Sequence, residues 1–162
     1  MDRTEREREA AQNRYLGWGL AFAETLPGID IARDISFSAG ANGRVLDLVR
    51  GTGNITQALS VALTTLRGSN VFDAEFGFDG LDALTRNIEP VLVREQVRVG
   101  VITLLDRDPR VRRIVDVNLD DRLGTGGSAA DLRASRTLQV QVQFETVTDD
   151  RIAVNLGELP SV

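Results

Sequence analysis

The stretch from residue 89 to residue 119 places a helix directly before a strand. Apolar residues recur there at i, i+4, i+8, i+11 and i+12, the stripe of an amphipathic helix: Val93, Val97, Val101, Leu104 and Leu105. Pro90 suits the first helical turn, where its missing N–H would have no partner. Pro109 disfavours helical geometry at the residue before it, so we expect the helix to end just before Asp108.

From residue 111 the hydrophobic period changes to that of a strand. Val115, Val117 and Leu119 alternate with Asp116, Asn118 and Asp120. This alternation predicts a strand over residues 111–121 with one buried face. A rigid Asp-Pro-Arg corner at residues 108–110 joins it to the helix.

The C-terminal part of the chain alternates more regularly. Leu138, Val140, Val142 and Phe144 alternate with Gln139, Gln141, Gln143 and Glu145, and Ile152, Val154 and Leu156 repeat the pattern after a turn at Asp149–Asp150. Residues 137–156 are therefore predicted to form a β-hairpin. Together with 111–121 the hairpin predicts a three-stranded antiparallel sheet.

A second helix is predicted after Asn54, which suits an N-cap position. Its apolar stripe runs from Ile55 to Leu66, and Gly68 stands where a helix-terminating glycine belongs. Residues 24–53 carry turn signals and short extended pieces, and Gly51 and Gly53 are expected to form a turn before the helix. Residues 78–88 predict one or two helical turns, and 122–130 have the composition of a loop.

These elements predict an α+β fold, with two to three amphipathic helices packed on an antiparallel sheet of about three strands. Residues 1–15 are expected to form a charged N-terminal arm, and residues 16–162 a single domain. The arm is either a solvated segment or a helix that binds a partner. The segment from Tyr15 to Phe22 is either a buried anchor or a direct binding element.

The composition excludes several classes of function. The chain has no Cys and no His, which removes disulfides, thiolate nucleophiles, zinc sites of the usual kind and His-based triads. A net charge of −5 argues against a nucleic-acid surface. No apolar run approaches the roughly 18 residues that a membrane helix needs, so we expect a soluble protein of the cytoplasm.

Several motifs occur together in the order found in one family. Gly17, Gly19, Leu20, Ala21 and Phe22 come first, then Gln57-Ala58-Leu59, Thr64 or Thr65, Gly68, Phe76-Gly77 and Asp108-Pro109-Arg110. Over residues 16–121 the chain thus resembles the gene-25-like baseplate wedge, or sheath-initiator, family of contractile phage tails, which includes the small baseplate subunit of type VI secretion. Asp108 departs from the family's Glu-Pro-Arg corner, Ala23 stands where Pro is common, and Gly68-Ser69-Asn70 replaces a charged triplet.

The resemblance implies a structural protein that is not an enzyme, with no catalytic residue, cofactor or metal. It implies several copies in a six-fold particle assembled in the cytoplasm, beside sheath, other wedge subunits, hub or spike, and tube. The corner would contact the wedge core through Asp108, Pro109, Arg110, Arg112 and Arg113, a locally basic patch on an acidic protein. Sheath strands would add to the sheet beside Gln139, Gln141, Gln143, Ile152 and Val154.

Other interpretations stay open. Asp108 and Arg110 could simply stabilise a turn and a helix end, and the glutamine face could simply be solvated. A lysozyme-like glycoside hydrolase would need two carboxylates, for which Glu24, Asp73 and Glu75 are candidates near aromatic residues. An α+β adaptor outside any contractile particle is the third class.

Overall fold

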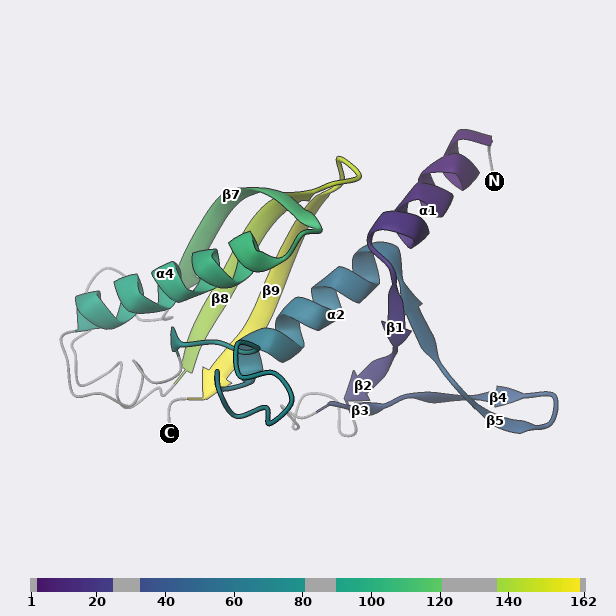
Figure 1. Cartoon of the computed structure of the whole chain (residues 1–162), viewed down its shortest axis with the longest axis horizontal. Helices are drawn as coiled ribbons and strands as arrows, with labels where there is room; N and C mark the ends of the chain where they lie inside the picture. The colour runs from purple at the N-terminus through teal and green to yellow at the C-terminus, as the bar shows by residue number, and fades with distance from the viewer. Residues whose placement is uncertain (1–2, 25–32, 81–89, 121–136, 161–162) are drawn as a thin grey trace. The chain divides into compact units, whose positions relative to one another are not determined.

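The computed structural model describes residues 3–24, 33–80, 90–120 and 137–160 (Figure 1). In chain order the elements are α1 (Arg3–Tyr15), β1 (Trp18–Leu20), β2 (Phe22–Glu24), β3 (Arg33–Ile35), β4 (Phe37–Gly40), β5 (Gly43–Leu46), β6 (Leu48–Arg50), α2 (Gly51–Thr64), α4 (Pro90–Arg107), β7 (Val111–Asp120), β8 (Thr137–Thr146) and β9 (Arg151–Pro160). Helices and antiparallel strands coexist, which confirms the α+β class. The turns predicted at 81–88 and the loop at 122–130 lie outside the described residues. No helix in the described part of the chain is both long and apolar enough to span a membrane.

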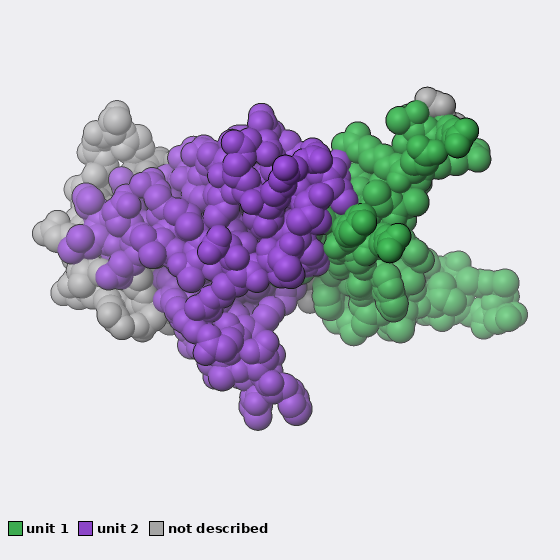
Figure 2. All heavy atoms as spheres, turned by 45° about the horizontal axis from the view of Figure 1, so that its top comes forward, with its two compact units in different colours: residues 1–58 green, residues 59–162 purple. Residues whose placement is uncertain are grey.

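The chain forms two compact units, residues 1–58 and residues 59–162 (Figure 2). The boundary falls inside α2. The charged N-terminal arm is helical from Arg3 to Tyr15, and none of the helix is buried. A helix without a buried face depends on side-chain pairs such as Arg3–Glu7, whose Nε and Oε1 atoms are 3.1 Å apart. The division into an arm and a single domain at residue 16 remains a prediction.

The first unit contains three two-stranded antiparallel ribbons: β1–β6, β2–β3 and β4–β5. They meet at a ring of three backbone hydrogen bonds. Ala21 N–H donates to Asp47 at 2.9 Å, Asp47 N–H to Ser36 at 3.0 Å, and Ser36 N–H to Ala21 at 2.8 Å. The Ser36 hydroxyl also donates to the Asp47 carboxylate at 2.6 Å. Ala21, Ser36 and Asp47 lie between successive strands, outside the ribbons. The ring gives their backbone groups the hydrogen-bond partners that no ribbon supplies there.

The second unit is built on the sheet of β7, β8 and β9, with β8 in the centre and all neighbours antiparallel. Both the sheet and the C-terminal hairpin are confirmed. Figure 1 shows α4 lying along the sheet, and α4 contacts β7. The core contains fully buried side chains of α4 and β8: Val97, Val101, Leu105, Val140 and Phe144. Burial of these stripes is what holds the helix on the sheet.

Several local expectations are wrong. Asn54 does not cap α2, because the helix begins at Gly51 and the Asn54 side chain bonds elsewhere. Gly68 does not terminate it, because α2 ends at Thr64. Val115 does not share the buried face of β7. A bulge between Ile114 and Asp116 adds one residue to the strand and leaves Val115 40% exposed.

Candidate partner-binding sites

The Asp-Pro-Arg corner is a tight turn between α4 and β7. α4 ends at Arg107, as predicted, and Asp108 N–H donates to the Leu105 carbonyl at 3.1 Å. Val111 N–H then donates to the Asp108 carbonyl at 2.9 Å, which places Pro109 at the second position of a four-residue turn. Proline is favoured there because its fixed φ matches the turn. The corner is therefore rigid for local reasons.

Asp108 and Arg110 bind each other. Arg110 donates from its backbone N–H and from Nε to Asp108 Oδ1, at 3.0 and 2.9 Å, and from Nη2 to Oδ2 at 2.6 Å. Both side chains are largely buried, 13% and 23% exposed. Burial raises the pKa of Asp108, but the hydrogen bonds and positive charge of Arg110 outweigh it, so the pKa lies below its ordinary value of 3.8. This pairing supports the alternative interpretation, in which Asp108 and Arg110 stabilise the turn itself.

The neighbouring arginines are also paired. Arg112 forms an ion pair with Asp149, and Arg113 donates from Nη2 to Glu145 Oε1 at 2.8 Å. The prediction of a locally basic patch is therefore wrong. β8 and the turn that follows it bring Glu145 and Asp149 to the corner from 32 and 37 positions later in the chain, which local sequence does not reveal.

Glu145 lies between two arginines on the exposed sheet face. Its register partners are Arg113 on β7 and Arg151 on β9, and both donate to Oε1, at 2.8 and 2.9 Å. Hydrogen bonds from Arg113 and then Arg151 lower the pKa of Glu145 to about 2. This row ties all three strands together beside the corner.

The corner is also joined to the β8–β9 turn through the backbone. Val147 N–H donates to the Arg110 carbonyl at 3.0 Å. Inside that turn the Thr148 hydroxyl donates to Asp150 at 2.7 Å, and Asp150 N–H donates to the buried Thr146 hydroxyl at 3.2 Å. The corner and the hairpin turn thus form one ordered surface.

The residues predicted to accept sheath strands occupy two different strands. Gln139, Gln141 and Gln143 lie on β8, which pairs with β7 on one side and β9 on the other. A central strand has no unpaired backbone edge, so a sheath strand could not pair with the backbone of β8. Contact through the glutamine side chains stays a prediction. Ile152 and Val154 lie on β9, an outer strand of the sheet. Gln141 and Gln143 are exposed, as expected of the polar face.

Two motif segments that lie far apart in the sequence meet in the first unit. Gln57 donates from Nε2 to the Leu20 carbonyl at 2.6 Å and accepts from Phe22 N–H at 2.9 Å. Asn54, one turn earlier, donates to the Leu16 carbonyl at 2.9 Å. Its Oδ1 would lie 2.8 Å from a Cβ at residue 19, which accounts for Gly19. The segment is an anchor through its backbone and fully buried Leu16, whereas Tyr15 and Trp18 are exposed.

Gly77, the second residue of the Phe76-Gly77 motif, also has a structural role. Phe78 N–H donates to the Thr65 carbonyl at 2.8 Å, and Gly77 has φ +110. A Cβ on Gly77 would lie 2.7 Å from that same carbonyl oxygen. Only glycine allows so close a backbone approach.

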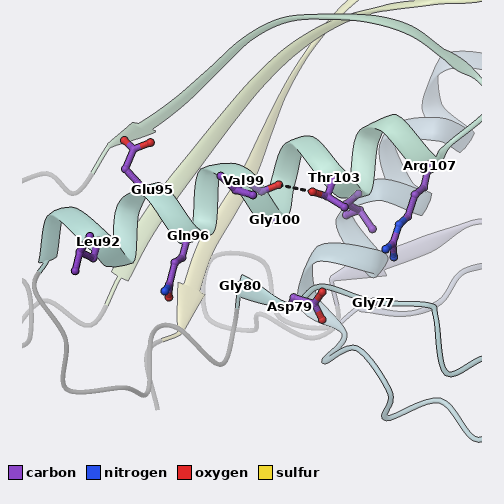
Figure 3. Close-up of a pocket in the computed structure, with 11 residues that line it drawn as sticks. Gly77, Asp79, Gly80, Leu92, Glu95, Gln96, Val99, Gly100, Thr103 and Arg107 are labelled. Carbon is purple, nitrogen blue, oxygen red and sulfur yellow. Dashed lines mark hydrogen bonds between the residues drawn. The ribbon is translucent and has the colours of Figure 1, made fainter.

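A groove of about 430 Å³ runs along α4 opposite residues 77–80 (Figure 3). Its carboxylates are already paired: Asp79 accepts from Arg67 at 2.7 Å, and Glu95 accepts from Arg98 at 2.7 Å. Of the glycosidase candidates, Glu75 pairs with Arg67, Asp73 is exposed, and the Glu24 side chain lies outside what the structure describes. The described residues contain no acidic cluster suited to a metal ion.

No protein-family model matches the sequence, and no curated protein matches it. A crystal structure described as that of a "putative tail lysozyme" from Geobacter sulfurreducens is similar to 63% of this chain, over 84% of its own length. The two chains are 19% identical, with a TM-score of 0.45.

Proposed function

We propose that this chain is a structural wedge subunit of the baseplate of a contractile injection system, where it docks on the wedge core and initiates sheath polymerisation. The observation that carries the proposal is the outer edge of β9. No described strand pairs with that edge, and an unpaired edge is a template for a strand of another chain. The other support is the family resemblance of residues 16–121.

The composition of the two outer strands favours β9 as the acceptor. β7 carries two bulges, and four charged residues lie along it: Arg112, Arg113, Asp116 and Asp120. Bulges and charges are the devices that block strand addition. β9 pairs without interruption from Arg151 to Asn155, with only one charged residue in that stretch. An incoming strand therefore meets a regular edge over residues 151–155 of β9, before the register shift between Asn155 and Glu158.

Docking on the wedge core would use the surface formed by the corner and the hairpin turn. Arg110 is committed to Asp108 inside the corner, so Arg112 and Arg113, both more than half exposed, offer their side chains more readily to a partner. Arg112→Ala is therefore the direct test of docking, in pull-downs with the other wedge subunits. Unchanged association of a folded Arg112→Ala, Arg113→Ala double variant would remove the docking role.

Sheath initiation is tested by assembling the cognate baseplate and tube with and without this chain, then adding sheath subunits and viewing the products by electron microscopy. Sheath should grow from the baseplate only when the chain is present. Ala153→Lys, on the β9 edge, should reduce initiation. Gln143→Lys is the matched control, because residue 143 is the register partner of Ala153 on the central strand. Equal growth without the chain would remove the initiator role.

A further inference from the structure

The β1–β6 ribbon has one face covered by α2. Gly19 and Val49 are register partners on that face. Asn54 of α2 lies against Gly19, and a Val49 methyl group would be 2.9 Å from a Cβ at Gly53. Glycines at both positions let the helix and ribbon approach closely.

The opposite face of the ribbon is apolar and exposed. Trp18 pairs with Arg50, and Leu20 pairs with Leu48, so all four side chains share this face. Trp18 is 65% exposed, Leu48 45% and Leu20 37%. Tryptophan and arginine are the residue types most enriched where binding energy concentrates in protein interfaces.

The backbone behind this face is held in place before any partner arrives. Gln57 bonds Leu20 and Phe22, Gly51 N–H donates to the Gly17 carbonyl at 3.0 Å, and Ala21 N–H donates to Asp47. A preformed surface loses little conformational entropy on binding, which favours affinity. The face therefore has both the residue types and the rigid backbone that are typical of a docking site.

We propose that this outer face, Trp18, Leu20, Leu48 and Arg50, binds an amphipathic helix of a partner protein whose apolar stripe is flanked by carboxylates. Three residues of strand span roughly 10 Å, about the diameter of a helix, and the same ribbon already packs a helix on its other face. Arg50 is the only charged residue among the four, so the complementary partner is acidic. A second copy of this face offers no carboxylate to Arg50.

Trp18 is the only tryptophan of the chain, so its fluorescence reports on this face directly. The full-length protein is titrated with two synthetic helical peptides that share one leucine stripe, flanked either by Glu or by Lys. The Glu peptide should shift Trp18 emission to shorter wavelength and saturate, with an affinity about tenfold or more above that of the Lys peptide. Arg50→Glu should reverse this preference.

Leu48→Ser should weaken binding of the Glu peptide severalfold. Val45→Ser is the matched control, since Val45 is similarly exposed, at 50%, but lies on the β4–β5 ribbon. No emission shift with either peptide, equal affinity for both, or equal loss in the Val45 control would overturn the proposal. An emission shift on raising the protein concentration alone would assign the face to self-association instead. These outcomes do not depend on the proposed baseplate role, because the titration contains only this protein and a synthetic peptide.

Discussion

Arg110 places Nε and Nη2 on the two carboxylate oxygens of Asp108, two residues earlier in the chain. The Arg110 guanidinium therefore uses these two donors within its own turn, where they are not available to a partner protein. Aspartate suits this geometry because its short side chain also accepts the Arg110 backbone N–H. The corner therefore acts as a preformed structural unit, and any docking depends on the arginines that flank it.

Replacing Asp108 with Asn should destabilise the protein more than breaking a surface pair does. The change removes charge-assisted hydrogen bonds from a partly buried arginine, at a cost of about 1–3 kcal/mol in the free energy of unfolding. Asp149→Asn, which breaks the exposed pair with Arg112, should cost under about 1 kcal/mol. Urea denaturation measures both. Equal costs would show that the corner pair contributes no more than a surface contact.

The same pair predicts a pH dependence. The pKa of Asp108 in the folded protein lies below its ordinary value of 3.8, so the stabilisation is complete above that value and is lost as the pH falls through the folded pKa. Unfolding free energies measured from pH 6 to pH 2 should fall less steeply below about pH 4 for Asp108→Asn than for the wild type. Parallel curves would contradict the assigned shift.

Glu145 should titrate with a pKa of about 2. Its pKa is depressed, so its contribution to stability is present above its ordinary value of 4.5 and is lost as the pH falls toward 2. Arg113→Gln should raise the pKa toward the ordinary value, and removing Arg151 as well should raise it further. Carboxyl-carbon NMR measures this directly. Arg112→Gln is the control, since Arg112 pairs with Asp149, and should leave the Glu145 resonance unmoved.

Hydrophobic periodicity predicts the elements of the second unit because α4 and β8 each have one apolar stripe, and that stripe is buried in the core. α4 buries Val97, Val101 and Leu105, and β8 buries Val140, Val142 and Phe144, all at the expected spacing. The bulge that exposes Val115 could not be predicted from the sequence pattern, because a register shift changes which residues pair without changing the alternation of apolar and polar residues. Pairing of the corner arginines with Asp149 and Glu145 was equally hidden, because their proximity depends on tertiary structure.

The ribbons of the first unit were harder to predict. Their strands are three or four residues long, too short to display a period, and apolar side chains such as Phe37 and Leu46 remain exposed. The decisive contacts are made by side-chain amides. Asn54 fits the N-cap pattern, but its side chain donates to the Leu16 carbonyl, 38 positions earlier in the chain. The local sequence does not distinguish an asparagine that caps a helix from one that bonds a distant backbone group. The glycines at 17 and 19 were the only signal of that close approach.

Gly77→Ala should be more damaging than Gly68→Ala. Both glycines have positive φ, +110 and +81, which costs an alanine about 1–2 kcal/mol. A Cβ at residue 68 meets no atom within 4 Å, whereas one at residue 77 also meets the Thr65 carbonyl and Arg67 backbone below 3.0 Å. The added overlap should cost about 1–3 kcal/mol more. Thermal and urea unfolding of the two variants provide the comparison, and equal losses would assign the whole effect to φ.

Gly19→Ala should be partly rescued by Asn54→Ala. The alanine methyl would lie 2.8 Å from Asn54 Oδ1, so the first change alone should cost about 1–3 kcal/mol. Asn54→Ala alone loses the hydrogen bond to Leu16, about 1 kcal/mol. The double variant should be more stable than the sum of the two by roughly 0.5 kcal/mol or more. Gly19→Ala with Thr64→Ala, at the exposed C-terminal end of α2, should instead be additive. Additivity in both pairs would mean that Asn54 does not set the requirement for glycine at residue 19.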